Sequence, residues 1–311
     1  MDKMFLRLIP FAAVAVLAAV GVCTANFTVI CYIAAVFALF IIDMAGDRFA
    51  AIGMNVLFLC TAALFGGASY VFLLGLLAVS LAFVMTFVIK ITADFGYTFA
   101  AGIADFSVCF MIIDMLSKMS DPSGGLFKMF GSAVDSVFAV VLKNINSLTD
   151  VSGYTAESLD FMRQYISAMA DAVKLMLPGI IITAGGAVCI IVLIASRICI
   201  KGMPVPPLSG IRAPKVIVYV FCLMYIASGF ITGSGTASFI VANAVLVLSC
   251  IMMLCGFSVV KYLTDKIKPK PVSVAVFIIF IPICFAMSTI LTFVGMADGI
   301  FKFRSLDNEK E

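Results

Sequence analysis

The chain contains no histidine and no tryptophan, and only 12% of its 311 residues are charged. Because imidazole is absent, we exclude histidine metal ligands, histidine general bases and histidine pH switches. Because indole is absent, any aromatic belt at a membrane surface must be built from the 8 tyrosines and 29 phenylalanines. The 20 basic and 17 acidic residues nearly balance and form no dense basic patch. A nucleic-acid-binding protein is therefore excluded.

Apolar residues are what the chain has in excess, at 64% with a mean hydropathy of +1.22. Soluble globular chains average about 45–50% apolar and about 25% charged residues. So little charge cannot cover the surface of a soluble globule. The ten cysteines lie in or beside apolar stretches without a C-x-x-C pair, so we interpret them as buried small hydrophobes. The composition indicates a polytopic membrane protein.

Nine apolar runs approach or reach the length of about 20 residues that crosses hydrocarbon as a helix. They cover residues 5–22, 27–42, 49–66, 69–89, 96–116, 177–195, 216–232, 237–260 and 272–296. The second run is short and follows the first closely, so the count is eight or nine. We predict an all-α fold, a polytopic transmembrane bundle of eight or nine helices with one extramembrane helical hairpin.

The runs divide the chain into three segments that form one integral membrane domain. We predict an N-terminal membrane bundle over residues 1–116, the hairpin over 117–173 and a C-terminal membrane bundle over 174–311. The positions of lysine and arginine favour a cytoplasmic N-terminus. Nine spans would place the C-terminal tail outside, whereas its basic residues Lys302, Arg304 and Lys310 favour the inside. Eight spans would remove this conflict.

Between residues 117 and 173, apolar side chains recur at helical spacing in two sets, with polar residues on the other faces. A polar stretch around residues 149–153 separates the two sets. We predict a hairpin of two amphipathic helices. Their apolar faces either pack on each other or lie on the membrane surface. The alternative is a lid over an outward-facing cavity.

Asp105 is the clearest acid inside an apolar run, close to the middle of residues 96–116. A lone carboxylate at that depth costs roughly 2.5–3.5 kcal/mol on insertion scales, so it is normally protonated, paired or in contact with water. Asp94, Thr98 and Gly102 share its helical face and form a strip of small and polar groups with it. The strip is our candidate substrate or proton site.

No lysine or arginine lies at a similar depth in another run, so Asp105 has no obvious basic partner. Four roles remain open for this carboxyl. It packs as a neutral acid, it is protonated and hydrogen-bonded to Asn55, Asn243 or a hydroxyl, it binds a cation or amine, or it carries a proton.

Two other segments are candidate contacts for a partner protein. Four prolines hold the loop over residues 201–215 extended and stiff, and Arg212 and Pro214 of this loop are candidate contact residues. A rigid connector that carries positive-inside charge is the alternative. Ala15 and Ala19 form a small-x-x-x-small pair, which permits close helix contact.

Pro282 lies within the last apolar run and predicts a kink there.

A pattern of residues in the C-terminal half points to a family. It consists of Pro178, Arg197, Pro207, Arg212, Pro214, Gly295, Asp298, Phe301 and Arg304. With this pattern the chain resembles the YybS-like predicted membrane proteins of bacteria, whose layout of hydrophobic segments covers roughly its whole length. Family members are distantly similar to the substrate-binding S components of energy-coupling-factor transporters. The resemblance implies a place in the inner membrane of a bacterium, and it implies that Ala15 and Ala19 would meet an energising partner.

The function that we predict is a small-solute binding or uptake component of the membrane, with Asp105 at the binding site. The alternative is a structural or scaffold membrane protein that docks a partner through its loops. We predict no enzymatic activity, because the chain has no histidine and no G-x-S-x-G motif. The expected partners are the lipid bilayer and an energising or scaffold protein, and we expect no nucleic acid, cofactor or metal.

Overall fold

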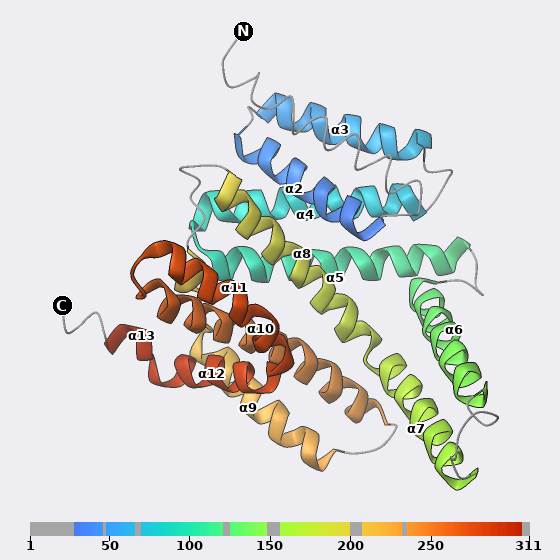
Figure 1. The fold of residues 1–311 in the computed structure, drawn as a ribbon. Helices are drawn as coiled ribbons and strands as arrows, with labels where there is room; N and C mark the ends of the chain where they lie inside the picture. The colour runs from blue at the N-terminus through green and yellow to red at the C-terminus, as the bar shows by residue number, and fades with distance from the viewer. Residues whose placement is uncertain are drawn as a thin grey trace. The chain divides into compact units, whose positions relative to one another are not determined.

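The structure is a computed structural model that describes residues 28–45, 48–65, 70–120, 125–147, 156–199, 207–231 and 235–306. Every regular element in these ranges is a helix (Figure 1). The helices are α2 (Thr28–Ala45), α3 (Arg48–Phe65), α4 (Tyr70–Thr92), α5 (Phe95–Ser120), α6 (Leu126–Ser147), α7 (Ala156–Leu175), α8 (Leu177–Cys199), η2 (Leu208–Gly210), α9 (Lys215–Phe230), α10 (Thr236–Asp265), α11 (Lys270–Ala286), α12 (Ser288–Phe301) and α13 (Phe303–Leu306). The all-α prediction is confirmed for the described residues.

Four of the described helices are long and apolar enough to cross a membrane, over Gly75–Thr92, Phe95–Met119, Leu177–Arg197 and Thr236–Asp265. Shorter apolar helices cover Ile30–Met44, Lys215–Phe230, Lys270–Phe280 and Ser288–Phe301. A helix satisfies its own backbone polar groups, which is what hydrocarbon demands of a spanning segment. The first apolar run, residues 5–22, lies outside the described residues, so the predicted total of eight or nine spans stays a prediction.

The last predicted run, residues 272–296, is divided between α11 and α12. The division falls at Met287, whose backbone (φ −109°, ψ 37°) departs from the helix while its N–H still donates to the Ile283 carbonyl. Pro282, where we expected a kink, lies inside α11, one turn before the division. Neither half reaches the length of about 20 residues that spans hydrocarbon. One continuous span was therefore the wrong prediction for this run.

The chain forms two compact units. The first comprises Met1–Phe110, Ile182–Val218 and Cys250–Glu311, and the second comprises Met111–Ile181 and Tyr219–Ser249. In the first unit, α2 packs against α3 and α4, and α3 packs against α4 (Figure 1). Leu81, Met85 and Ile89 recur every fourth residue along α4 and are fully buried, because that spacing keeps them on one face.

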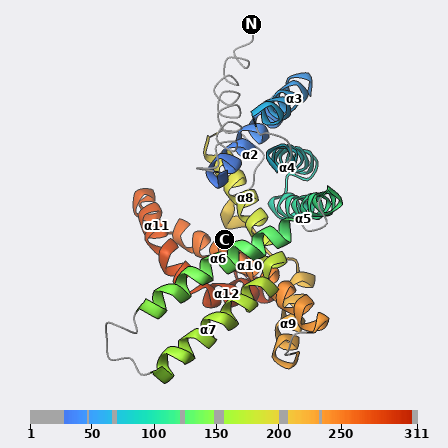
Figure 2. The ribbon, with the colours of Figure 1, turned by 90° about the vertical axis from the view of Figure 1, so that its right-hand side faces the viewer.

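The second unit contains the predicted pair of amphipathic helices, α6 and α7, which lie side by side (Figure 2). The two helices are linked by an ion pair of 2.7 Å between Lys174 Nζ and Asp135 Oδ1. Asp114 Oδ1 accepts the backbone N–H of Phe127 at the start of α6, and Asp114 also pairs with Lys118 at 2.7 Å. The apolar faces do pack on each other in part, since Leu159 and Ala170 of α7 are buried.

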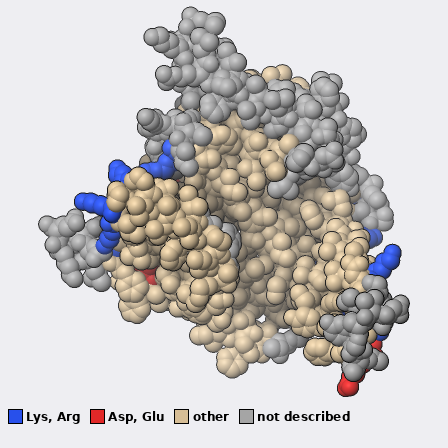
Figure 3. Space-filling view, in the orientation of Figure 1, with Lys and Arg blue, Asp and Glu red and all other residues tan. Residues whose placement is uncertain are grey.

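Many large apolar side chains lie exposed on the outside of the helices. On α9, exposed side chains recur at alternating steps of three and four residues, at Val216, Tyr219, Leu223, Ile226 and Phe230. The last of these, Phe230, is 83% exposed. In the view of Figure 3, uncharged atoms cover most of the described surface and charged atoms are few. A continuous apolar stripe of this kind is suited to lipid rather than to water.

Candidate functional site

Asp105 lies half-buried on α5 in a small polar cluster. The Ser80 hydroxyl, on α4, donates a hydrogen bond of 2.7 Å to Asp105 Oδ1. One turn further along α5, the Cys109 thiol lies 3.5 Å from Ser80 Oγ and 3.8 Å from Asp105 Oδ1. The first unit thus brings together a carboxyl, a hydroxyl and a thiol from two adjacent helices. Among the hydrogen-bond partners that the sequence offered for Asp105, a hydroxyl is the one that binds it.

Two polar atoms beside this cluster are buried and have no hydrogen-bond partner among the described residues. They are Asp105 Oδ2 and the Tyr32 hydroxyl of α2. The Tyr32 phenol lies close enough to Asp105, Cys109 and Cys189 of α8 to interact with them electrostatically. A buried polar atom without a partner costs about 1–3 kcal/mol. The cluster therefore offers one acceptor and one hydroxyl to a ligand, a water molecule or a proton.

The small residues of the predicted strip allow neighbouring helices to approach Asp105. A Cβ atom at Gly102, one turn before Asp105, would lie 2.7 Å from Cys189 Sγ and 3.3 Å from Met85 Cγ. At Gly185 of α8, a Cβ atom would collide with the ring of Phe106. Glycine at both positions lets α8 pack directly on α5, so these residues shape the surroundings of the carboxyl.

Asp94 and Thr98, which we predicted as members of the site, belong to the start of α5 instead. Asp94 is exposed, and its Oδ1 accepts the Tyr97 backbone N–H at 2.9 Å, as an N-cap residue does. The buried Thr98 hydroxyl donates to the Asp94 carbonyl at 2.7 Å. Asp94 precedes Asp105 by three helical turns, roughly 16 Å at 1.5 Å per residue. A shared helical face therefore did not bring them to a shared site.

The two asparagines predicted as partners of Asp105 bind elsewhere. Asn55 of α3 donates to Asp43 Oδ1 at 3.0 Å, and Lys90 donates to the Asp43 carbonyl at 2.6 Å. These bonds tie the end of α2 to α3 and α4.

Asn243 belongs to the second unit, where it joins α10 to the junction of α7 and α8. Its Oδ1 accepts the Gly179 N–H at 2.6 Å and its Nδ2 donates to the Leu175 carbonyl at 2.9 Å. Both asparagines thus satisfy structural hydrogen bonds. Ser80, which supplies the hydroxyl of the cluster, carried no signal in the sequence beyond its place in an apolar run.

The residues that carried the family resemblance meet around Arg304. Its guanidinium donates to Asp298 Oδ2 through Nε (3.1 Å) and Nη2 (2.5 Å). It also donates to the carbonyls of Ser209 and Ile211 and to the Ser258 hydroxyl, each at 2.6 Å. The sequence places these residues in one pattern but does not predict that they touch, because almost a hundred residues separate Arg304 from Ser209.

These bonds hold the C-terminal segment against the loop that follows α8. Arg304 follows α12, whereas Ser209 and Ile211 precede α9, so the end of α12 and the start of α9 lie at the same end of the helices. The side of the membrane on which the tail lies stays a prediction.

Other residues of the pattern have packing roles. A Cβ atom at Gly295 of α12 would collide with the Met252 carbonyl and the Gly256 N–H of α10, so the two backbones touch there. Pro178 is the second residue of α8, where its missing N–H has no partner to lose. Arg197 lies in the last turn of α8. Phe301 is exposed, and its ring stacks on Phe303 at 5.6 Å between centroids.

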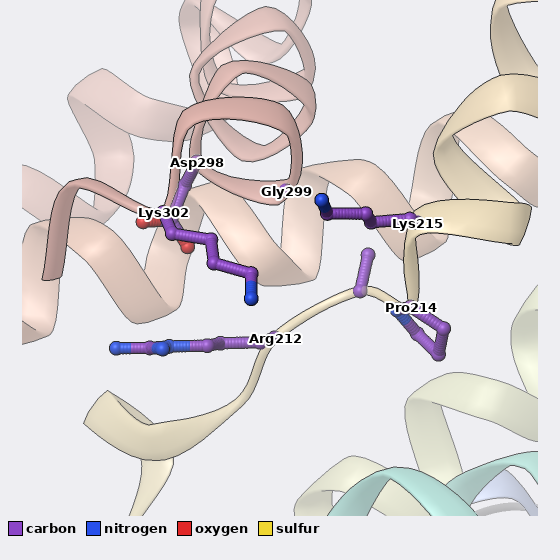
Figure 4. Close-up of a pocket in the computed structure, with 7 residues that line it drawn as sticks. Arg212, Pro214, Lys215, Asp298, Gly299 and Lys302 are labelled. Carbon is purple, nitrogen blue, oxygen red and sulfur yellow. The ribbon is translucent and has the colours of Figure 1, made fainter. Parts of the chain in front are cut away.

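A cavity of about 390 Å³ lies beside the Arg304 cluster, lined by Arg212, Ala213, Pro214, Lys215, Asp298, Gly299 and Lys302 (Figure 4). It contains Arg212 and Pro214, our predicted partner contacts. Lys215 and Lys302 could not be predicted as members of one site, since only the fold places the start of α9 beside the end of α12. Ala15 and Ala19, the other predicted partner contacts, lie outside the described residues. Within the described ranges, no group of three or more Cys, Asp or Glu residues is arranged to hold a metal ion.

The helices, their apolar surfaces and the buried polar clusters define a helical membrane protein with several apolar helices. The model of the family described as "Predicted membrane protein (DUF2232)" matches residues 11–299, nearly the whole chain. The chain belongs to this family. No curated protein and no solved structure matches the chain.

Proposed function

We propose that this protein is a small-solute binding or uptake component of the membrane, and that Asp105 contacts the solute. The observation that carries the proposal is the pair of unpartnered buried atoms, Asp105 Oδ2 and the Tyr32 hydroxyl, in one polar cluster. An acid within an apolar membrane helix seldom lacks a role, because a carboxylate there has a high free-energy cost. The resemblance to transporter S components agrees with this assignment.

The chemistry of the cluster favours a solute that carries an amine or another cationic group. Asp105 has one oxygen engaged by Ser80 and one oxygen open. A carboxylate accepts hydrogen bonds and attracts positive charge, and charge-assisted bonds of this kind are about twice as strong as neutral ones. The Tyr32 hydroxyl can donate to, or accept from, a polar group of the same solute.

Native mass spectrometry of the protein released in a gentle detergent tests the proposal. We expect a small-molecule mass on the wild type that is absent from Asp105→Asn. Asparagine keeps an oxygen that can accept from Ser80, so this variant retains the fold while it loses the charge. Tyr32→Phe removes only the hydroxyl, and we expect it to weaken binding without abolishing it.

Asp94→Asn is the matched control. It makes the same chemical change on the same helix, and asparagine caps a helix as well as aspartate does. We expect Asp94→Asn to retain the ligand mass. Equal ligand masses on the wild type and Asp105→Asn, with both folded, would contradict the site, and a bare chain in both would contradict the function.

A scaffold role is the second candidate, and the surface of the α6–α7 hairpin supports it. Val137 and Val140 of α6 and Phe161 and Tyr165 of α7 are each at least 59% exposed. Exposed apolar side chains that gather on one element are typical of an interaction surface. If this candidate is right, Val137→Ser combined with Phe161→Ser removes a co-purifying protein, while Asp105→Asn leaves it bound.

A further inference from the structure

The cavity beside Arg304 lies in the first unit, where α9 begins and α12 ends. Arg212 and Pro214 belong to the loop before α9, Lys215 is the first residue of α9, and Lys302 directly follows α12. In Figure 4 the side chains of Lys215 and Lys302 extend toward one another across the space between the loop and α12. The volume of about 390 Å³ falls within the range of about 300–1,000 Å³ that is usual for small-ligand sites.

The charge of the lining is strongly positive. Three of the seven lining residues are basic, namely Arg212, Lys215 and Lys302, and one is acidic. That acid, Asp298, is already engaged by the buried guanidinium of Arg304 at 2.5 Å. The positive N-terminal end of α9 and the negative C-terminal end of α12 both border the cavity, so their dipoles oppose each other. The formal charges therefore decide which ligands the cavity attracts, and they favour an anion.

The depth of the cavity narrows the choice of anion. Helices α9 and α12 are largely apolar, and the basic residues Lys215 and Lys302 stand at their ends. Basic residues at the ends of apolar membrane helices lie at the level of the lipid headgroups. Basic pockets between such helices bind the phosphate of anionic lipids. A guanidinium matches two phosphate oxygens at once, and ammonium groups add point charges around it.

We propose that this cavity binds a phosphate group, held by Arg212, Lys215 and Lys302. An anionic phospholipid is the source that the position at the helix ends favours. A soluble phosphorylated compound carries the same group and is the second source. Arg304 does not contact the phosphate in this assignment. It holds the loop and α12 together and engages Asp298, which would otherwise repel an anion.

The test compares the full-length wild type with Arg212→Gln/Lys215→Gln/Lys302→Gln. The proteins are placed in nanodiscs made of a four-to-one mixture of phosphatidylcholine and phosphatidylglycerol. Native mass spectrometry then counts the lipids that remain bound when the disc is removed. We expect the wild type to retain phosphatidylglycerol in preference to phosphatidylcholine by about tenfold or more, and the variant to lose this preference.

The matched control is Lys266→Gln/Lys268→Gln/Lys270→Gln. It also removes three positive charges, but from the connection between α10 and α11, away from the residues that line the cavity. We expect this control to keep the preference for phosphatidylglycerol. Equal loss in both triple variants would overturn the proposal, because it would mean that surface charge alone attracts the lipid. No preference in the wild type, together with no response to soluble phosphate, would overturn it as well.

The second arm distinguishes the two sources. Inorganic pyrophosphate is added to the detergent-solubilised proteins, and their melting temperatures are measured. In one outcome, pyrophosphate raises the melting temperature of the wild type and of the control but not of the cavity variant, and no lipid preference is seen. This outcome supports the phosphate site and identifies a soluble ligand. A lipid preference without a response to pyrophosphate supports the phospholipid.

Two single variants at Lys302 keep the proposal testable if the triple variant misfolds. Lys302→Arg keeps the positive charge at the end of α12, whereas Lys302→Glu reverses it at the same position. We expect Lys302→Arg to bind as the wild type does and Lys302→Glu to lose at least about tenfold in preference. Equal binding by these two variants would contradict the role of Lys302.

Discussion

Arg304 and Asp298 form an ion pair in which Nη2 lies 2.5 Å from Oδ2, and the two side chains are only 2% and 1% exposed. All the N–H directions of the guanidinium are used, because Ser209, Ile211 and Ser258 accept the remaining hydrogen bonds. Full use of its donors makes the buried charge of the guanidinium tolerable, although Asp298 Oδ1 has no hydrogen-bond partner among the described residues. The pair ties the segment after α12 to the loop before α9, and Asp298 also lines the basic cavity.

The pair predicts that removal of Arg304 is severe. Arg304→Met leaves Asp298 buried without its partner, which costs about 3–5 kcal/mol in comparable buried pairs. We expect a clearly lower melting temperature of the detergent-solubilised protein and a larger aggregated fraction on size-exclusion chromatography. Arg212→Met removes an exposed arginine from the neighbouring loop and serves as the control. A melting temperature for Arg304→Met equal to that of Arg212→Met would mean that the pair does not stabilise the fold.

The contact between α10 and α12 predicts opposite effects for two glycine substitutions. Gly295→Ala would place a methyl group against the Met252 carbonyl and the Gly256 N–H, and overpacking of this kind costs about 1–3 kcal/mol. Gly229 of α9 has no atom within 4 Å of the position of its Cβ. Alanine there should be neutral or stabilising by about 0.5–1 kcal/mol, because glycine weakens a helix. The measurement is the melting temperature of each variant, and similar values for both would refute the close contact.

The ion pair between α6 and α7 predicts that the folded protein is less stable at high pH. The pKa of Lys174 is raised above the ordinary lysine value, chiefly because its ammonium group donates a hydrogen bond to Asp135, with Asp171 adding to the effect. A raised pKa means that the folded state holds the proton more tightly than the unfolded state. The stabilisation is therefore complete below the ordinary lysine pKa of about 10.4 and is lost as the pH rises through the higher pKa of the folded protein.

Comparison with Lys174→Met isolates this effect, since methionine cannot ionise. We expect the wild type to melt at a higher temperature than Lys174→Met at about pH 9, and the difference to vanish toward about pH 12, well above the ordinary lysine value. Lys174→Arg keeps its charge throughout this range, so its advantage over Lys174→Met should persist. A difference between wild type and Lys174→Met that does not change with pH would show that the hydrogen bond contributes nothing through its charge.

The contacts of Arg304 also predict the topology of the C-terminal half. Protease recognition sites can be inserted in residues 148–155, in residues 200–206 and after Glu311. We expect the second and third sites to be cut from the same side of the membrane, because Arg304 binds the loop before α9. From the distribution of basic residues we expect that side to be cytoplasmic and the first site to be cut from the other side. Cleavage of the second and third sites from opposite sides would contradict the structure.

The positions of the helices could be predicted from hydropathy because spanning hydrocarbon imposes length and apolarity on each segment separately. The runs 69–89 and 96–116 correspond to α4 and α5 within a few residues. The last run failed because hydropathy is continuous across Met287, while the backbone is not. A change of direction within an apolar stretch leaves no mark in composition.

The candidate site was predicted in part for the same reason. Asp105 could be identified alone, since one acid in an apolar run needs no second segment to be noticed. Its partners could not, because Ser80 and Tyr32 lie on other helices and are ordinary residues there. Asp94 shares the face of Asp105, but periodicity reports direction around a helix and not distance along it.

The sequence by itself determined that this is an all-helical membrane protein, since its scarcity of charge and its apolar runs leave no other stable arrangement of the backbone. It also determined where the costly polar groups occur, because each is visible against its apolar neighbours. Only the tertiary structure decided which of them meet. Arg304 reaches Asp298 and the loop before α9, Asp105 reaches Ser80, and Arg212 joins Lys215 and Lys302 around one cavity. Contacts between distant segments depend on how helices pack, and the packing of apolar faces is encoded too diffusely to be read from a single sequence.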